Sequence, residues 1–219
     1  MLYRITHHVS RFMPTMSDEY KTIVGIAESK LVVKKSRFFG VATSVDTIEG
    51  SKRFLALLQE KYPNASHGCY AYSIGWGREK REYATDAGEP RNSAGPPILA
   101  AVTASQLSNV ICVVVRYYGG INLGIGGLIR AYGRCARECL ASAKIETQIF
   151  YKELQVRTPY KQIGAVLKLC GRLGGKVVNV EYNQRATVHL QIRQGEVKNF
   201  QENLRGINTD IDVIDPVTV

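Results

Sequence analysis

Residues 110–130 constrain the fold more than any other part of this chain of 219 residues. Residues 110–115 are apolar without interruption, so both faces of the strand that they predict are expected to be covered, as in the middle of a sheet. A glycine-rich segment follows, and then a segment with helical periodicity. The sequence therefore predicts a central strand that runs through a turn into a helix.

The turn combines glycines with flanking cations: Gly119, Gly120, Gly126, Gly127, Arg116 and Arg130. Glycine is favoured where φ is positive or where another group approaches the backbone closely. The N-terminus of a helix also binds anions well, because its first N–H groups have no partner within the helix. Two interpretations follow, a contact for a phosphate or nucleic acid, or a tight packing joint.

The strict nucleotide-binding motifs are absent from the turn. A dinucleotide fingerprint requires G-x-G-x-x-G, and counting from Gly124 the third glycine position is occupied by Ile129. A P-loop requires a Gly-Lys-Ser/Thr triplet, which does not occur in the chain. What remains is a general anion-suited turn with arginines able to grip phosphate oxygens.

The helix after the turn has two distinct faces. Its apolar face is predicted from steps of four, three, four and four through Leu128, Tyr132, Cys135, Cys139 and Ala143. A second face carries arginines in steps of four and three, with Lys144 further along. The candidate contacts for phosphate or nucleic acid are Arg116, Tyr117, Gly119, Gly120, Gly126, Gly127, Arg130, Arg134 and Arg137.

Residues 85–97 form the second unusual segment. It holds two carboxylates, Asp86 and Glu89, together with Arg91 and several turn-forming residues before Pro96-Pro97. The carboxylates are candidate Mg²⁺ ligands, since that ion binds one or two carboxylates with phosphate oxygens. Turn chemistry and a helix cap, with Glu89 paired to Arg91, explain the same residues more simply. No cofactor is therefore expected, with Mg²⁺ as the alternative.

Histidine and cysteine give no specific signal. His67 and Cys69 share a strand face beside the loop just described, and Cys135 and Cys139 share a helix face. Four such side chains are the right types for zinc, but no C-x-x-C motif is present, and cysteine is often simply buried. Nothing marks a nucleophile paired with a base, so no catalytic residue is predicted.

The chain is basic, with a formal charge of +10. Residues 17–145 carry +6 of that excess, and residues 1–16 and 146–219 carry +2 each. Such a balance is compatible with RNA, a phosphate ligand or a membrane surface, and equally with a solvated surface that serves solubility. The longest aliphatic run, residues 110–115, is too short to span a bilayer.

Five cysteines without framework spacing, and no secretory signal pattern in residues 1–15, predict reduced thiols and a cytoplasmic location. Residues 1–16 are expected to form a flexible N-terminal extension, with Met16 as a candidate start.

Two domains are predicted, at residues 17–145 and 149–219. The first is expected to have strands at residues 20–27, 31–33, 38–45 and 66–75, a helix capped by Thr47, and a long loop at residues 77–93. The second has the order β-α-β-β-α-β of a ferredoxin-like module, with Thr158 expected to cap its first helix. Residues 185–193 alternate cleanly but lack the aromatics with which RRM domains stack bases, which favours docking to a protein or to the first domain.

Several of these segments resemble the YigZ/IMPACT family: residues 66–72, Asp86 to Pro90, Ala94-Gly95 before residues 97–99, and above all residues 113–132. The resemblance covers about residues 20–215. It implies an α+β protein with an N-terminal ribosomal-protein/GHMP-kinase-like βαβ domain and a C-terminal ferredoxin-like domain similar to those of elongation factor G. The chain departs from the family pattern at Arg91-Asn92-Ser93, Pro96 and Asn122, and the last two replace cations.

Eukaryotic members of that family regulate translation by competing for the activator of an initiation-factor kinase, and they associate with ribosomes. The resemblance therefore implies a non-enzymatic regulator that binds RNA, the ribosome or a protein, with no membrane partner and an unknown oligomeric state. The alternative is an enzyme with a phosphate-bearing ligand at the glycine turn and Mg²⁺ near Asp86 and Glu89, beside His67 and Arg91.

Overall fold

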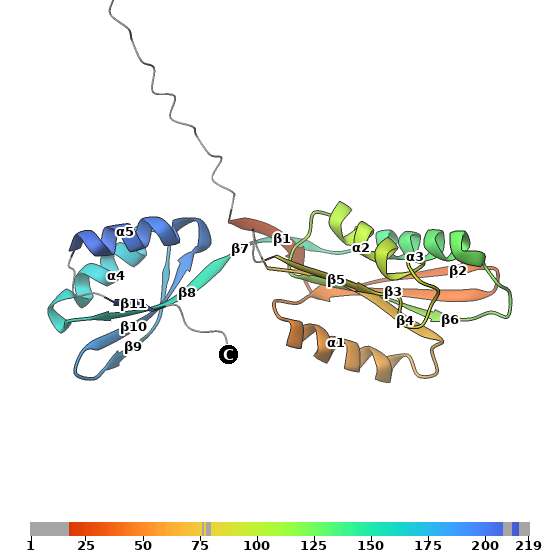
Figure 1. Ribbon diagram of the computed structural model, residues 1–219, viewed down its shortest axis with the longest axis horizontal. Coiled ribbons are helices and arrows are strands. Elements are labelled where there is room, and N and C mark those ends of the chain that lie inside the picture. Colours follow the sequence, from red (N-terminus) through yellow and green to blue (C-terminus); the bar gives the residue numbers. More distant parts are fainter. Residues whose placement is uncertain (1–17, 76, 78–79, 208–211, 215–219) are drawn as a thin grey trace, which may run out of the picture. The chain divides into compact units, whose positions relative to one another are not determined.

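The computed structural model describes residues 18–75, 77, 80–207 and 212–214. They form two compact units, one of Glu19–Phe150 and the other of Asp18 with the described residues from Tyr151 onward. Both units combine helices and strands, so the α+β class is confirmed (Figure 1). The predicted extension at residues 1–16 lies outside the described residues.

The first unit is built on a five-stranded sheet with the order β2-β3-β6-β4-β5. Its strands are β2 (Ile26–Val33), β3 (Ser36–Ser44), β4 (His67–Ile74), β5 (Arg81–Thr85) and β6 (Val110–Tyr117). The prediction of a central, covered strand is confirmed, because β6 pairs with both β3 and β4 and all of residues 110–116 are buried. Every pairing in the sheet is antiparallel.

Helices cover both faces of this sheet. On one face lies α1 (Ile48–Lys61), whose N-cap Thr47 accepts a hydrogen bond from the Gly50 N–H at 3.0 Å, as predicted. The other face carries α2 (Gly95–Ala104) and α3 (Gly124–Ala141), and Figure 1 shows the sheet between these two layers. Each face has its own core, because alternate residues of β6 point to opposite sides. Tyr132, Cys135 and Cys139 are fully buried in the α2–α3 side, which confirms the predicted apolar stripe.

Two features of the first unit differ from the prediction. The long loop expected at residues 77–93 contains β5, a short edge strand whose residues are mostly polar and exposed, so that no apolar alternation marks it. The strand expected at residues 20–27 is broken at Gly25, where φ is +72°. Its first part, β1 (Glu19–Ile23), pairs instead with β7 (Ile145–Ile149) in a separate two-stranded sheet.

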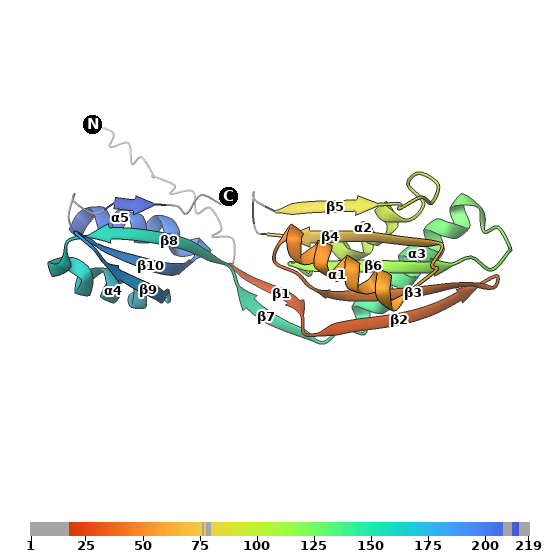
Figure 2. The same cartoon turned by 90° about the horizontal axis from the view of Figure 1, so that it is seen from below.

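The second unit has the ferredoxin-like order predicted for it. The strands β8 (Tyr151–Thr158), β9 (Lys176–Tyr182), β10 (Ala186–Arg193) and β11 (Asp212–Ile214) form a sheet with the order β11-β8-β10-β9. Between them run α4 (Ile163–Arg172) and α5 (Val197–Ile207), which lie together on one face of the sheet (Figure 2). Val188, Leu190 and Ile192 are buried beneath the helices as expected.

The prediction that Thr158 caps the first helix of this unit is wrong. Thr158 is the buried last residue of β8, and a 3-10 turn at Tyr160–Gln162 precedes α4. The Thr-Pro pair suits the end of a strand as well as a cap, because the residue before proline favours extended backbone. None of the helices in the described part of the chain is long and apolar enough to span a bilayer.

Candidate functional site

The glycine turn joins the end of β6 to the start of α3, and one of its glycines is a packing joint. A Cβ placed on Gly119 would lie 2.1 Å from the carbonyl carbon of Lys35, in the turn between β2 and β3. The Gly119 N–H also donates to the Ser36 hydroxyl at 3.1 Å. Only glycine allows the two turns to approach this closely.

Gly124 and Gly126 leave the first turn of α3 open, whereas a Cβ on Gly127 would lie 3.0 Å from the Cβ of Leu123. The N-cap residue Leu123 makes no capping hydrogen bond, and the first turn holds no acidic residue. Gly124, Ile125 and Gly126 are exposed. Helix N–H groups without a cap carry the positive end of the helix dipole, so this end of α3 is suited to an anion.

Exposed cations surround that helix end. Arg130 folds back over the first turn, since a Cβ on Gly126 would lie 3.5 Å from its Nη1. The sequence analysis missed two more, Lys34 and Lys35, which are exposed in the turn that packs on Gly119. A basic pair between two strand-like segments was the available signal, but only the fold shows that this turn abuts the glycines.

The other arginines of α3 are also exposed, as predicted, but they differ in their surroundings. Arg134 donates to Glu138 at 2.7 Å, one turn along the helix. Arg137 lies over Gly133, where a Cβ would come within 3.1 Å of its Nη1. The basic stripe therefore runs along α3 with one of its three cations partly neutralised.

Arg116 occupies a different place from the one expected of a surface contact. Its side chain is buried, and its Nη1 donates to Glu89 Oε1 at 2.6 Å. The Tyr132 hydroxyl donates to the same oxygen at 2.7 Å, and the guanidinium lies against the rings of Phe38 and Tyr118. Its charge is thus neutralised inside the unit, so Arg116 shapes the site from within.

The expected Glu89–Arg91 pair is wrong, because the counter-charge of Glu89 is Arg116 and Arg91 is exposed. Tyr117 is half-buried, and its hydroxyl donates to the carbonyl oxygen of Pro63 at 3.0 Å. It supports the end of the strand and is not directed at the turn.

Asp86 organises the loop before α2. Its carboxylate accepts from the N–H groups of Asn92, Ala94 and Gly95 at 2.8, 2.9 and 2.9 Å. Burial alone raises the pKa of this carboxyl, but these backbone hydrogen bonds outweigh it and bring the pKa below the ordinary value. Asp86 therefore acts as the turn and helix cap that the sequence analysis preferred.

His67 and Cys69 do not form a catalytic pair. The ring Nδ1 of His67 lies 3.0 Å from the carbonyl oxygen of Ala87. Burial raises the pKa of the Cys69 thiol to about 12, and the thiol donates to the carbonyl oxygen of Asp86 at 3.0 Å. A protonated, buried thiol is a poor nucleophile. Within the described ranges no three His, Cys, Asp or Glu side chains gather to hold a metal ion.

A hollow of about 490 Å³ opens at this end of the first unit. We call it the glycine-turn hollow. Its lining brings together residues from four segments of the sequence: Ser66, His67, Glu89, Pro90, Arg116, Tyr118, Asn122, Leu123, Gly124, Ile125 and Leu128. The first turn of α3 and the β4 end that carries His67 thus face a common space.

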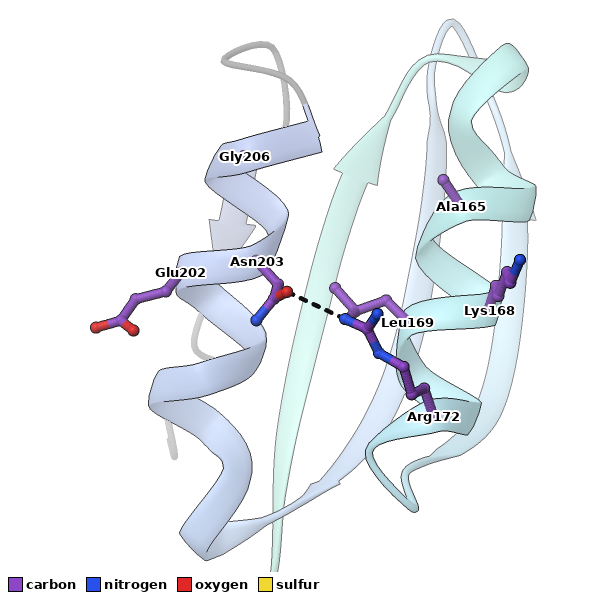
Figure 3. A pocket seen from close by; sticks show the side chains of 7 residues that line it. All are labelled: Ala165, Lys168, Leu169, Arg172, Glu202, Asn203 and Gly206. Carbon is purple, nitrogen blue, oxygen red and sulfur yellow. Dashed lines mark hydrogen bonds between the residues drawn. The ribbon is translucent and has the colours of Figure 1, made fainter.

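The second unit has a larger hollow, of about 810 Å³, between α4 and α5. Figure 3 shows Arg172 reaching toward Asn203, to which it donates a hydrogen bond of 3.0 Å. Glu202 and Lys168 point away from each other. Among the polar side chains that line the hollow, the structure therefore pairs Arg172 with Asn203, an arrangement that suggests no catalytic chemistry.

Comparison with known proteins agrees with this architecture. The Impact N-terminal domain family matches residues 34–140, and a domain of unknown function, DUF1949, matches residues 156–206. The IMPACT family member YigZ of Escherichia coli is 32% identical over 173 residues, which cover 78% of this chain and 85% of that protein. The chain belongs to the IMPACT family.

Two further relatives extend the comparison. An IMPACT family member of Thermus thermophilus is 40% identical over 135 residues, covering 62% of this chain and 72% of that protein. A crystal structure of a hypothetical protein is 27% identical, covers 92% of this chain and 98% of its own, and superposes with a TM-score of 0.68. Both domains of the chain therefore occur together in a protein of known structure.

Proposed function

We propose that this member of the IMPACT family is a non-enzymatic regulator of translation that binds RNA, on the ribosome, through the end of the first unit described above. The observation that carries the proposal is the uncapped first turn of α3 among the exposed cations Lys34, Lys35 and Arg130. Phosphate oxygens accept hydrogen bonds from free helix N–H groups and pair with such cations. Arg134 and Arg137 extend the contact along the helix.

The buried groups support this surface without touching RNA. Glu89 cancels the charge of Arg116 inside the unit, and Asp86 is occupied by three backbone N–H groups. The first turn of α3, which lines the glycine-turn hollow, therefore holds no acidic residue that would compete with a phosphate for these cations. All five cysteines are free and buried, which suits a reducing compartment and places the protein, in this proposal, in the cytoplasm.

The test is binding of the full chain to ribosomes and to RNA at increasing salt. Each phosphate contact makes the slope of log affinity against log salt concentration steeper by about 0.7–0.9, because binding releases a counterion. Arg130→Gln and Lys35→Gln should each weaken binding and flatten that slope by about one contact. Lys198→Gln, an exposed position on α5 with the same loss of charge, serves as the matched control. Absence of binding to either target at low salt refutes the proposal.

Two simple experiments test the competing functions, a protein partner and a phosphate-ligand enzyme. An affinity pull-down that recovers a defined protein, and that is insensitive to nuclease, supports a protein partner in place of RNA. A thermal shift with a nucleotide and Mg²⁺ supports the phosphate-ligand enzyme. The engagement of Asp86 by backbone N–H groups speaks against that enzyme, because these bonds occupy the oxygens a metal ion requires.

A further inference from the structure

The hairpin of β4 and β5 carries three tyrosines on the sheet face that α1 covers. Tyr72 and Tyr83 are direct partners across the two strands, and Tyr70 is the next residue on the same face of β4. The ring centroids of Tyr72 and Tyr83 are 5.6 Å apart, with an angle of 25° between the planes, and those of Tyr70 and Tyr83 are 5.9 Å apart. We call these three residues the tyrosine platform.

Helix α1 covers this face only in part. Figure 2 views the unit from the α1 side and shows α1 across β4, β6 and β3, with β5 uncovered at the edge of the sheet. Tyr70 and Tyr72 are half-buried against the α1 core, so packing accounts for part of their role. Tyr83 packs on both of these rings but is 47% exposed, so part of its ring is open to solvent.

The charges around the platform favour an anionic partner. Arg81 is exposed and pairs in register with Ile74. It therefore lies on the platform face, at the end of the hairpin where β4 connects to β5. Glu82 lies on the opposite face, beside the Ser73 hydroxyl. Among the described residues of β4 and β5, the platform face carries a cation and no carboxylate.

The platform continues into the surface proposed above to bind phosphate. A hollow of about 570 Å³ lies between α1 and the sheet, and Tyr70, Val113 and Gln59 are among its lining residues. Ser66 and His67 line both this hollow and the glycine-turn hollow. The two hollows thus meet at the start of β4, and they lead from the first turn of α3 to Tyr70, the platform residue nearest that end; we call this path the track.

We propose that this track binds single-stranded RNA, with phosphates at the first turn of α3 and successive bases stacked on the tyrosine platform. The inference rests on the proposed RNA binding and adds which form of RNA is bound. Every base has a π-face that stacks on an aromatic ring, so such a platform recognises unpaired bases with little sequence preference. In a duplex the bases already stack on each other and cannot reach the rings.

The experiment compares three fluorescently labelled probes by anisotropy with the full chain: a 12-nucleotide single-stranded RNA, the same backbone without bases, and a 12-base-pair RNA duplex. Loss of a stacked base weakens binding by about 5- to 150-fold. Tyr83→Ala should weaken binding of the single strand by that factor and leave its salt slope unchanged. The same substitution should leave the backbone-only probe and the duplex unaffected.

Two variants control for loss of structure and for nonspecific stacking. Tyr83→Phe keeps the ring and should bind the single strand within about twofold of the wild type. Tyr182→Ala removes a tyrosine that is 66% exposed in the second unit and should have no effect. Circular dichroism of each variant verifies the fold.

The outcomes separate the two proposals. If the single strand and the backbone-only probe bind equally well and Tyr83→Ala behaves as the wild type, the platform is refuted while phosphate binding stands. If the duplex binds more tightly than the single strand, the platform is likewise refuted. If none of the probes binds, both proposals fall.

Discussion

Gly119, in the turn between β6 and α3, and Gly126, in the first turn of α3, allow a paired test of which positions are packing joints and which are open surface. The Cβ of an alanine at position 119 would lie 2.1 and 2.3 Å from the carbonyl carbon and oxygen of Lys35 and 2.4 Å from the nitrogen of Ser36. Ordinary contacts between carbon atoms lie at about 3.5–4.0 Å, so the two turns must separate by more than an ångström. At position 126 the nearest atom is Arg130 Nη1 at 3.5 Å, on a flexible side chain.

The two substitutions are expected to change the free energy of unfolding in opposite directions. Separating the turns costs about 1–3 kcal/mol of overpacking, and losing the hydrogen bond from the Gly119 N–H to Ser36 costs about 1 kcal/mol more. Gly119→Ala should therefore lower the free energy of unfolding of the first unit by about 2–4 kcal/mol. Gly126→Ala should raise it by up to about 1 kcal/mol, because alanine favours helix over glycine.

Urea unfolding followed by tryptophan fluorescence measures both variants. The chain has one tryptophan, Trp76, which lies in the sequence between β4 and β5. Far-UV circular dichroism follows the whole chain in parallel. Equal stability of Gly119→Ala and Gly126→Ala, or a stable Gly119→Ala, would refute the packing argument. RNA binding by Gly126→Ala separately tests whether the open turn needs its glycine for access.

Two further predictions concern the buried and capping carboxylates. Glu89→Ala leaves the Arg116 guanidinium buried without a counter-charge and should lower the free energy of unfolding in urea by about 3–5 kcal/mol. Tyr132→Phe removes one hydrogen bond to a charged group and should lower it by about 1.5–3 kcal/mol. Equal losses of stability would contradict the ion-pair argument. Asp86 has a pKa below its ordinary value of 3.8, so it stabilises the fold fully above that pH and loses its contribution as the pH falls through the lower folded-state value. Asp86→Asn should therefore flatten the acid limb of the stability profile below about pH 4, and an unchanged limb would show that the cap does not titrate.

Local sequence pattern predicted the parts of the fold whose side chains alternate clearly. β6 was identifiable because its residues are apolar on both faces, and α3 because its buried stripe follows the helical period. β5 was missed because an exposed edge strand needs no apolar residues, and the break at Gly25 was missed because the residues on either side favour strands equally. The order of the C-terminal module followed from its strands and helices alone.

The candidate site was less accessible to prediction, because its parts come from distant segments. Glu89 and Arg116 are 27 residues apart, and only the register of β4 beside β6 brings the loop after β5 over Arg116. Lys35 and Gly119 meet through β3 and β6, which pair antiparallel. Residue types at the glycine turn suggested anions, but which cations stay exposed depends on these long-range contacts.

The pairing of β1 with β7 has a consequence for how the chain is divided. Glu19 is the register partner of Ile149, so the polypeptide enters and leaves the first unit at adjacent positions, about 5 Å apart across an antiparallel ladder. Asp18, one residue earlier, belongs to the second unit, where its carboxylate accepts two hydrogen bonds from Arg193 at 3.0 and 2.8 Å. The first unit thus begins and ends at neighbouring positions of one ladder, and Asp18 is the described residue before it that belongs to the second unit. A short linker could accordingly join Phe150 to Glu19, and the chain could be opened at an exposed loop instead. The resulting circular permutant of the first unit would keep every strand pairing.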